Sequence, residues 1–122
     1  MKSILIVDDS RTTRNYHAAI TSSAGYDVVT ANDGSDGLEK MLDREFDLIL
    51  TDINMQGIDG YEFIRRVRSA GNESVPIIII STESQAKDQS KGYAAGANLY
   101  IIKPSEPDLL LGYVRMMLGE TS

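Results

Sequence analysis

Cysteine, long hydrophobic runs and an excess of positive charge are all absent from this sequence. Without cysteine the chain can form neither a disulfide framework nor a thiolate metal site, and it is compatible with a reducing compartment. No apolar run approaches the roughly 20 residues of a membrane-spanning helix, and the run near the N-terminus is too short for a signal-peptide core. We therefore expect a cytoplasmic protein that does not cross a membrane.

The charge balance also excludes classes of partner. Twelve Lys and Arg residues against eighteen Asp and Glu residues give a net charge of −6. Phosphate backbones and anionic lipid surfaces repel such a chain, so neither nucleic acid nor a membrane is expected as a direct partner. The 122 residues, 42% of them hydrophobic, suit one domain with its own core. No linker interrupts them, so residues 1–122 are predicted to form a single domain without an output domain.

Short apolar runs alternate with longer amphipathic stretches. The runs span residues 4–7, 28–29, 48–50, 77–80 and 99–102. Such runs are typical of strands buried on both faces of a parallel sheet, and the mixed second run indicates an edge strand. Helices are predicted over residues 11–24, 35–42, from 59 onward, 85–95 and 105–118. This order predicts an α/β fold, a doubly wound five-stranded parallel sheet with helices on both faces.

The helix from Gln85 to Ala95 is predicted to be the least stable. Gly92 lies in its interior, where glycine costs about 1 kcal/mol relative to alanine. Its apolar face is expected to consist only of Ala86, Tyr93 and Ala94.

Polar residues follow four of the five predicted strands. They are Asp8-Asp9, Thr51-Asp52, Ser81-Thr82-Glu83 and Lys103-Pro104. A single Asp after a strand most often caps the next helix. In a parallel sheet, however, the carboxyl ends of the strands meet at one edge, where ligands bind. Matched positions at four ends therefore favour one shared site.

Each residue type has a chemical reason to be in such a site. Clustered carboxylates repel one another, and oxygen ligands without His or Cys favour Mg²⁺ or Ca²⁺. A carboxylate can attack a phosphoryl group and form an acyl phosphate. The ammonium group of Lys103 and a metal ion would neutralise charge on the transferring group, to which Ser81 could donate a hydrogen bond.

These residues resemble the signature of bacterial response-regulator receiver domains. Residues 55–60 resemble the loop that follows the acceptor Asp in that family, and residues 95–97 its Ala-Gly-Ala turn. The resemblance covers the whole chain and is closest to a stand-alone, CheY-like member. It implies a flavodoxin-like fold with strand order 2-1-3-4-5, the order of CheY. It also implies a monomeric switch in a two-component system, such as a chemotaxis system, and no enzyme beyond its own phosphotransfer and dephosphorylation.

The resemblance also implies the roles of the acidic residues. Asp52 would accept a phosphoryl group from a sensor histidine kinase. Asp9, Asp52 and the backbone carbonyl of Asn54 would hold Mg²⁺, and Asp8 would act through water. Lys103 would pair with Asp52 and later with the phosphoryl group.

A second group of residues would carry the response. Ser81 would be the switch hydroxyl, and Tyr100 the aromatic residue that moves inward when Ser81 moves. Asn54 and Glu83 occupy positions that tune the lifetime of the phosphoryl group, and Thr82 would control access to the site. A downstream protein would bind around the segment from Gln85 to Ala95, Tyr100 and the segment from Ser105 to Leu118.

Three positions depart from the family pattern, namely Gln56, Ile58 and Ser105, and His17 has no part in it. Ser105 follows Lys103-Pro104 where many members have Phe, so the start of the last helix loses an apolar plug. His17 is expected to be exposed on the first helix and to have no role in phosphotransfer. Gln56 and Ile58 depart from the usual loop without touching the chemistry.

Two other classes of function remain open. Haloacid-dehalogenase-type phosphatases use Asp-x-Asp, but here the second position is Asn54, and no cap domain is present. A flavodoxin-like cofactor binder needs a Ser/Thr/Gly-rich phosphate loop after the first strand, where Asp8 and Asp9 would repel a flavin phosphate.

Overall fold

Five strands alternate with five helices in the computed structural model, which describes residues 1–120. The strands are β1 (Ser3–Val7), β2 (Asp27–Ala31), β3 (Leu48–Thr51), β4 (Ile77–Ser81) and β5 (Leu99–Ile102). The helices are α1 (Arg11–Ser23), α2 (Gly34–Asp43), α3 (Gly60–Ser69), α4 (Ala86–Ala95) and α5 (Pro107–Met117). All ten elements predicted from the sequence are present. Thr121 and Ser122, the end of the predicted domain, lie outside the described residues.

The five strands form one parallel sheet in the order β2-β1-β3-β4-β5, which confirms the predicted fold. β1, β3 and β4 are fully buried, whereas β2 is only half-buried and lies at an edge, as predicted. Val7 of β1 is in register with Thr51 of β3. The residues that follow these two strands therefore lie side by side where the strand order reverses.

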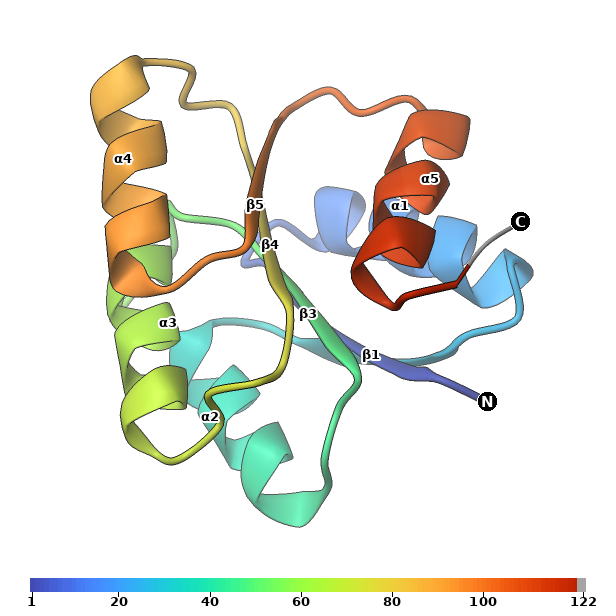
Figure 1. Ribbon diagram of the computed structural model, residues 1–122, viewed down its shortest axis with the longest axis horizontal. Coiled ribbons are helices and arrows are strands. Elements are labelled where there is room, and N and C mark those ends of the chain that lie inside the picture. The colour runs from blue at the N-terminus through green and yellow to red at the C-terminus, as the bar shows by residue number, and fades with distance from the viewer. Residues whose placement is uncertain (121–122) are drawn as a thin grey trace.

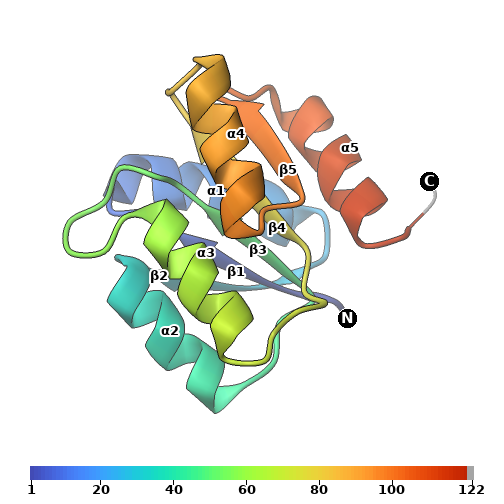
Figure 2. The ribbon, with the colours of Figure 1, turned by 60° about the vertical axis from the view of Figure 1, so that its left-hand side comes forward.

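Helices cover both faces of the sheet (Figures 1 and 2): α2, α3 and α4 lie on one face, and α1 and α5 on the other. Alternate side chains of each strand enter the two cores, because successive residues point to opposite faces. Leu5 and Ile49 pack with Phe63 of α3, and Ile6 and Leu110 belong to the other core. Among the described residues, no helix combines the length and apolar character that crossing a membrane requires.

His17 is buried, and the prediction that it is exposed is wrong: its exposed fraction is 3%. The buried residues of α1 are the polar His17 and Thr21, while Ala18 and Ile20 pack against the core partly buried. The hydroxyl of Thr21 donates to the carbonyl of His17 at 2.8 Å, which satisfies one of these buried groups within the helix. The polar character of His17 therefore led to a wrong prediction of the side of α1 on which it lies.

The packing face of α4 also differs from the prediction. Gly92 and Ala95 are its buried residues, whereas Ala86, Tyr93 and Ala94 are exposed. The helix packs through small residues because it lies close to the sheet, a spacing that hydrophobicity cannot reveal.

Candidate functional site

Three carboxylates meet beyond the carboxyl ends of β1 and β3. One carboxylate oxygen each from Asp8, Asp9 and Asp52 lies within 4.8 Å of the other two. The backbone amide of Asp52 donates to the carbonyl of Val7 at 3.0 Å, which fixes the two loops against each other. Asp8 is buried, Asp52 is half-buried and Asp9 is exposed. The sheet register therefore brings together the acidic residues that the sequence predicted to share a site.

Lys103, at the end of β5, completes this cluster. Its ammonium nitrogen lies 3.0 Å from Oδ2 of Asp52 and 3.3 Å from Oδ2 of Asp8. The pairing with Asp52 was predicted, and the pairing with Asp8 was not. One ammonium group against three carboxylates leaves an excess of negative charge. That excess and the all-oxygen donor set fit a hard divalent cation such as Mg²⁺.

Backbone amides orient the second carboxylate oxygen of Asp52 and of Asp8. Oδ1 of Asp52 accepts from the amide of Ile53 at 2.7 Å, and Oδ1 of Asp8 accepts from the amide of Ser10 at 2.9 Å. Arg14 reaches back from α1 and donates to the carbonyl of Asp8 at 2.8 Å. The role of Arg14 in holding this loop carried no signal in the sequence.

Gly60, at the start of α3, allows that helix to approach the acceptor loop. Its amide donates to the carbonyl of Ile53 at 2.8 Å. A Cβ at residue 60 would overlap the backbone oxygen of Asp52, which cannot move without moving the loop. Asp59 caps the same helix by accepting from the amide of Glu62 at 2.9 Å.

Glu83 connects the residues predicted to carry the response. Its carboxylate accepts from the side-chain amide of Asn54 at 2.9 Å, so the two predicted tuning residues contact each other. Its backbone amide donates to the hydroxyl of the fully buried Ser81 at 3.1 Å. Its carbonyl accepts from the hydroxyl of Tyr100 at 2.7 Å. Thr82 is exposed beside this group.

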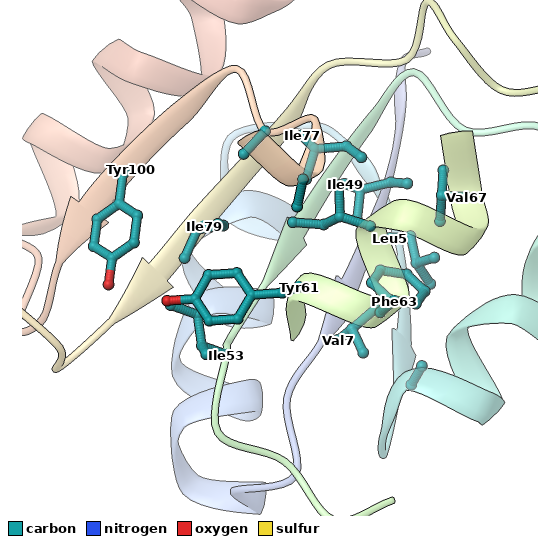
Figure 3. Packing of buried hydrophobic residues seen from close by; sticks show 14 of the residues in the cluster. Leu5, Val7, Ile49, Ile53, Tyr61, Phe63, Val67, Ile77, Ile79 and Tyr100 are labelled. Atoms are coloured by element: carbon teal, nitrogen blue, oxygen red, sulfur yellow. The ribbon is translucent and has the colours of Figure 1, made fainter. Parts of the chain in front are cut away.

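Tyr100 occupies the inward position, with an exposed fraction of 9%. Its hydroxyl and that of Tyr61 point toward the same region beside Ile79 in Figure 3. Tyr61 donates to the carbonyl of Asp88 in α4 at 3.2 Å. Burial raises the pKa of Tyr100 and raises that of Tyr61 to about 12, so both remain hydrogen-bond donors at neutral pH.

A cavity of about 240 Å³ lies between α1 and the β5–α5 loop, next to Lys103. Tyr16, His17 and Ser105 line it, and the Ser105 hydroxyl is buried without a partner among the described residues. This cavity is at the place where the sequence predicted the loss of an apolar plug. Burial, assisted by the charge of Lys103 and opposed by that of Asp52, lowers the pKa of His17 to about 4. The imidazole is therefore neutral at pH 7.

The fold and the site together define a parallel α/β domain with an acidic, Lys-containing pocket at the switch in strand order. The family model for the response regulator receiver domain matches residues 4–115, and the chain belongs to this family. Such domains are phosphoryl-accepting signalling switches of two-component systems that bind Mg²⁺ at an acidic pocket, and this chain is a switch of that class.

Several relatives support this assignment. The chain is 39% identical over 119 residues to the transcriptional regulatory protein DltR of Streptococcus agalactiae, covering 98% of this chain and 53% of DltR. It is 37% identical to the sensor kinase/phosphatase CqsS of Vibrio cholerae, covering 91% of this chain and 16% of CqsS. The chain thus spans about half the length of DltR.

Solved structures give the same result. Chemotaxis protein CheY4 of Vibrio cholerae matches with a TM-score of 0.92 and 35% identity, covering 96% of this chain and 98% of CheY4. The response regulator TrrA of Thermotoga maritima, solved in complex with Mg²⁺ and BeF, matches with a TM-score of 0.86 and 30% identity, covering 96% and 99% of the two chains.

Proposed function

We propose that Asp52 is the phosphoacceptor and that the donor is a phosphohistidine of a sensor histidine kinase. The supporting observation is the position of Asp52, whose Oδ1 is oriented by a backbone amide and whose Oδ2 lies 3.0 Å from Lys103. A carboxylate oxygen attacks phosphorus, the P–N bond breaks, and the imidazole leaves with the electron pair. Lys103 is then free to pair with the new phosphoryl oxygens.

The proposed Mg²⁺ ligands are Asp9, Asp52 and the backbone carbonyl of Asn54, with Asp8 acting through water. When bound, the cation neutralises charge on the phosphoryl oxygens. Asp8 is the most buried of the three carboxylates, which suits a role through water rather than direct contact with the ion. Asp9 is exposed, and its carboxylate is therefore accessible to the ion.

Ser81 and Tyr100 are proposed to pass the signal onward. The Ser81 hydroxyl would donate to a phosphoryl oxygen on Asp52, and such a hydrogen bond to a charged group contributes about 1.5–3 kcal/mol. That energy corresponds to a roughly ten- to hundredfold shift between two conformations. Because Tyr100 is bonded to the carbonyl of Glu83 in the inward position, phosphorylation would increase the population of this position rather than create it.

The proposed output face consists of α4, β5 and α5, from Gln85 to Ala95, Tyr100, and from Ser105 to Leu118. Large hydrophobic side chains are exposed on each of these elements. They are Tyr93 at 46%, Ile102 at 42%, Leu109 at 51% and Met116 at 55% exposure. We propose that a downstream protein covers this face. A monomeric, cytoplasmic switch that catalyses only its own phosphotransfer and dephosphorylation fits this role.

Asn54, Glu83 and Thr82 are proposed to set the lifetime of the phosphoryl group. The Asn54–Glu83 hydrogen bond is exposed to solvent, two residues along the chain from Asp52, and would orient an attacking water. We therefore expect a short-lived phosphoryl group. A half-life of many hours at neutral pH would contradict this expectation.

Labelling by acetyl phosphate in the presence of Mg²⁺ tests the acceptor. Asp52→Asn should abolish labelling because an amide is not a nucleophile. Asp43→Asn, an exposed Asp at the end of α2, is the matched control and should label as the wild type does. Full, acid-stable labelling of Asp52→Asn would identify a different acceptor.

Amide-resonance mapping with and without beryllofluoride tests the output face. We expect shifts beyond the active-site loops in α4, β5 and α5. Ser81→Ala should still accept the phosphoryl group but show smaller shifts in these elements. Shifts mainly in α1 and α2 would show that the proposed face is wrong.

A further inference from the structure

Gly92 lies in the interior of α4 and faces the sheet. A glycine there costs about 1 kcal/mol relative to alanine. Its backbone has no positive φ, so its conformation does not require glycine. Glycine is required there by the lack of space for a side chain. A Cβ at residue 92 would lie 2.7 Å from Cδ1 of Ile79 and 3.2 Å from Cδ2 of Tyr100.

The two neighbours of this missing Cβ differ in their freedom to move. Ile79 is fully buried in the core, so its Cδ1 has little room to retreat from an added methyl group. The ring of Tyr100 is less buried, with an exposed fraction of 9%, and its outer end is held inward by the hydrogen bond from its hydroxyl to the carbonyl of Glu83. An added methyl group therefore acts mainly on the Tyr100 ring.

The helix itself is also held at both ends. Near its start, the carbonyl of Asp88 accepts from Tyr61 at 3.2 Å. Just past its end, the carbonyl of Gly96 accepts from the guanidinium group of Arg68 at 2.8 Å. These bonds oppose a shift of α4 away from the sheet. An added methyl group at residue 92 therefore moves the Tyr100 ring rather than the helix.

We propose that Gly92 is a positioning residue for Tyr100 and that side-chain volume at residue 92 sets how often the ring occupies the inward position. A methyl group there shifts the ring outward and reduces the response of the output face. This consequence for signalling rests on the proposed function. The effect on Tyr100 does not, because it is present without phosphorylation.

The test compares Gly92→Ala with Gly112→Ala. Gly112 lies in α5, is exposed, and a Cβ there would meet nothing within 4 Å. Both variants add one methyl group to a helix interior, so they match in helix propensity. Fluorine resonances of fluorotyrosine-labelled protein report on the ring, with Tyr100 assigned from its loss in Tyr100→Phe. The solvent isotope shift of that resonance measures exposure.

We expect Gly92→Ala to increase the isotope shift of Tyr100 about twofold or more and Gly112→Ala to leave it unchanged. An unchanged shift in Gly92→Ala, or equal changes in both variants, would overturn the proposal. Ile79→Val removes the Cδ1 contact and leaves the ring contact. The effect should persist in Gly92→Ala/Ile79→Val, and a return to the wild-type shift would overturn the role of Tyr100.

A thermal double-mutant cycle covers the case in which Gly92→Ala alone folds poorly. In a Tyr100→Leu background the ring is absent, so Gly92→Ala should change the melting temperature less unfavourably than in the wild type. Equal changes in the two backgrounds would overturn the proposal. Labelling of Asp52 is measured on the same proteins and should be unaffected by Gly92→Ala. If the wild type is not labelled at Asp52, the proposed acceptor is refuted, but the result for Tyr100 is unaffected.

Discussion

Burial of a neutral His17 should make the protein less stable in mild acid. The folded pKa of about 4 lies below the ordinary value of 6.5. Between these two values the unfolded chain binds a proton that the folded chain excludes. The stabilisation by neutral His17 is therefore complete above about pH 6.5 and is lost as the pH falls toward about 4.

The size of this loss follows from the two pKa values. Protonation of the unfolded state alone lowers the free energy of unfolding by about 2 kcal/mol at about pH 5. The full difference approaches roughly 3 kcal/mol at still lower pH. His17→Gln removes the titrating group, so its stability should fall less over the same range. Carboxylates that titrate there are common to both proteins and cancel in the comparison.

Urea unfolding followed by circular dichroism is the suitable assay, because the chain contains no tryptophan. The free energy of unfolding is measured for both proteins at about pH 7.5 and about pH 5. We expect the wild type to lose about 2 kcal/mol more than His17→Gln. The same loss in both proteins, within about 0.5 kcal/mol, would refute the assignment of this pH dependence to His17. Labelling of Asp52 at neutral pH should be similar in the two proteins.

Three further predictions concern the site. Millimolar Mg²⁺ should raise the melting temperature of the wild type, and Asp9→Asn should remove most of this shift; an equal shift in both proteins would contradict the role of Asp9. Gly60→Ala should destabilise the fold by about 1–3 kcal/mol in urea unfolding and slow labelling of Asp52, because its Cβ overlaps the Asp52 backbone oxygen. Glu83→Ala should prolong the acyl phosphate several-fold, because it frees the side chain of Asn54, and a shorter lifetime would argue against a water-orienting role.

The order and type of the elements could be predicted from the sequence because they depend on local patterns. Continuous Ile and Val runs are needed where a strand is buried on both faces, and their alternation with amphipathic stretches determined the parallel α/β fold. The same order placed Asp8, Asp52, Ser81 and Lys103 at strand ends, and parallel strands bring such ends to one edge. The site could therefore be predicted as a set of residues before any distance was known.

Only the tertiary structure decided which side chains contact one another within that set. The bond from Lys103 to Asp8 and the bond from Tyr100 to the carbonyl of Glu83 join segments far apart in the chain. The burial of His17 depends on what packs against α1. The need for glycine at residue 92 depends on the distance between α4 and Tyr100. These features depend on the spacings between elements that lie far apart in the sequence. The hydrophobic pattern did not identify the inward residues of α1 and α4, and it carries no information on such spacings.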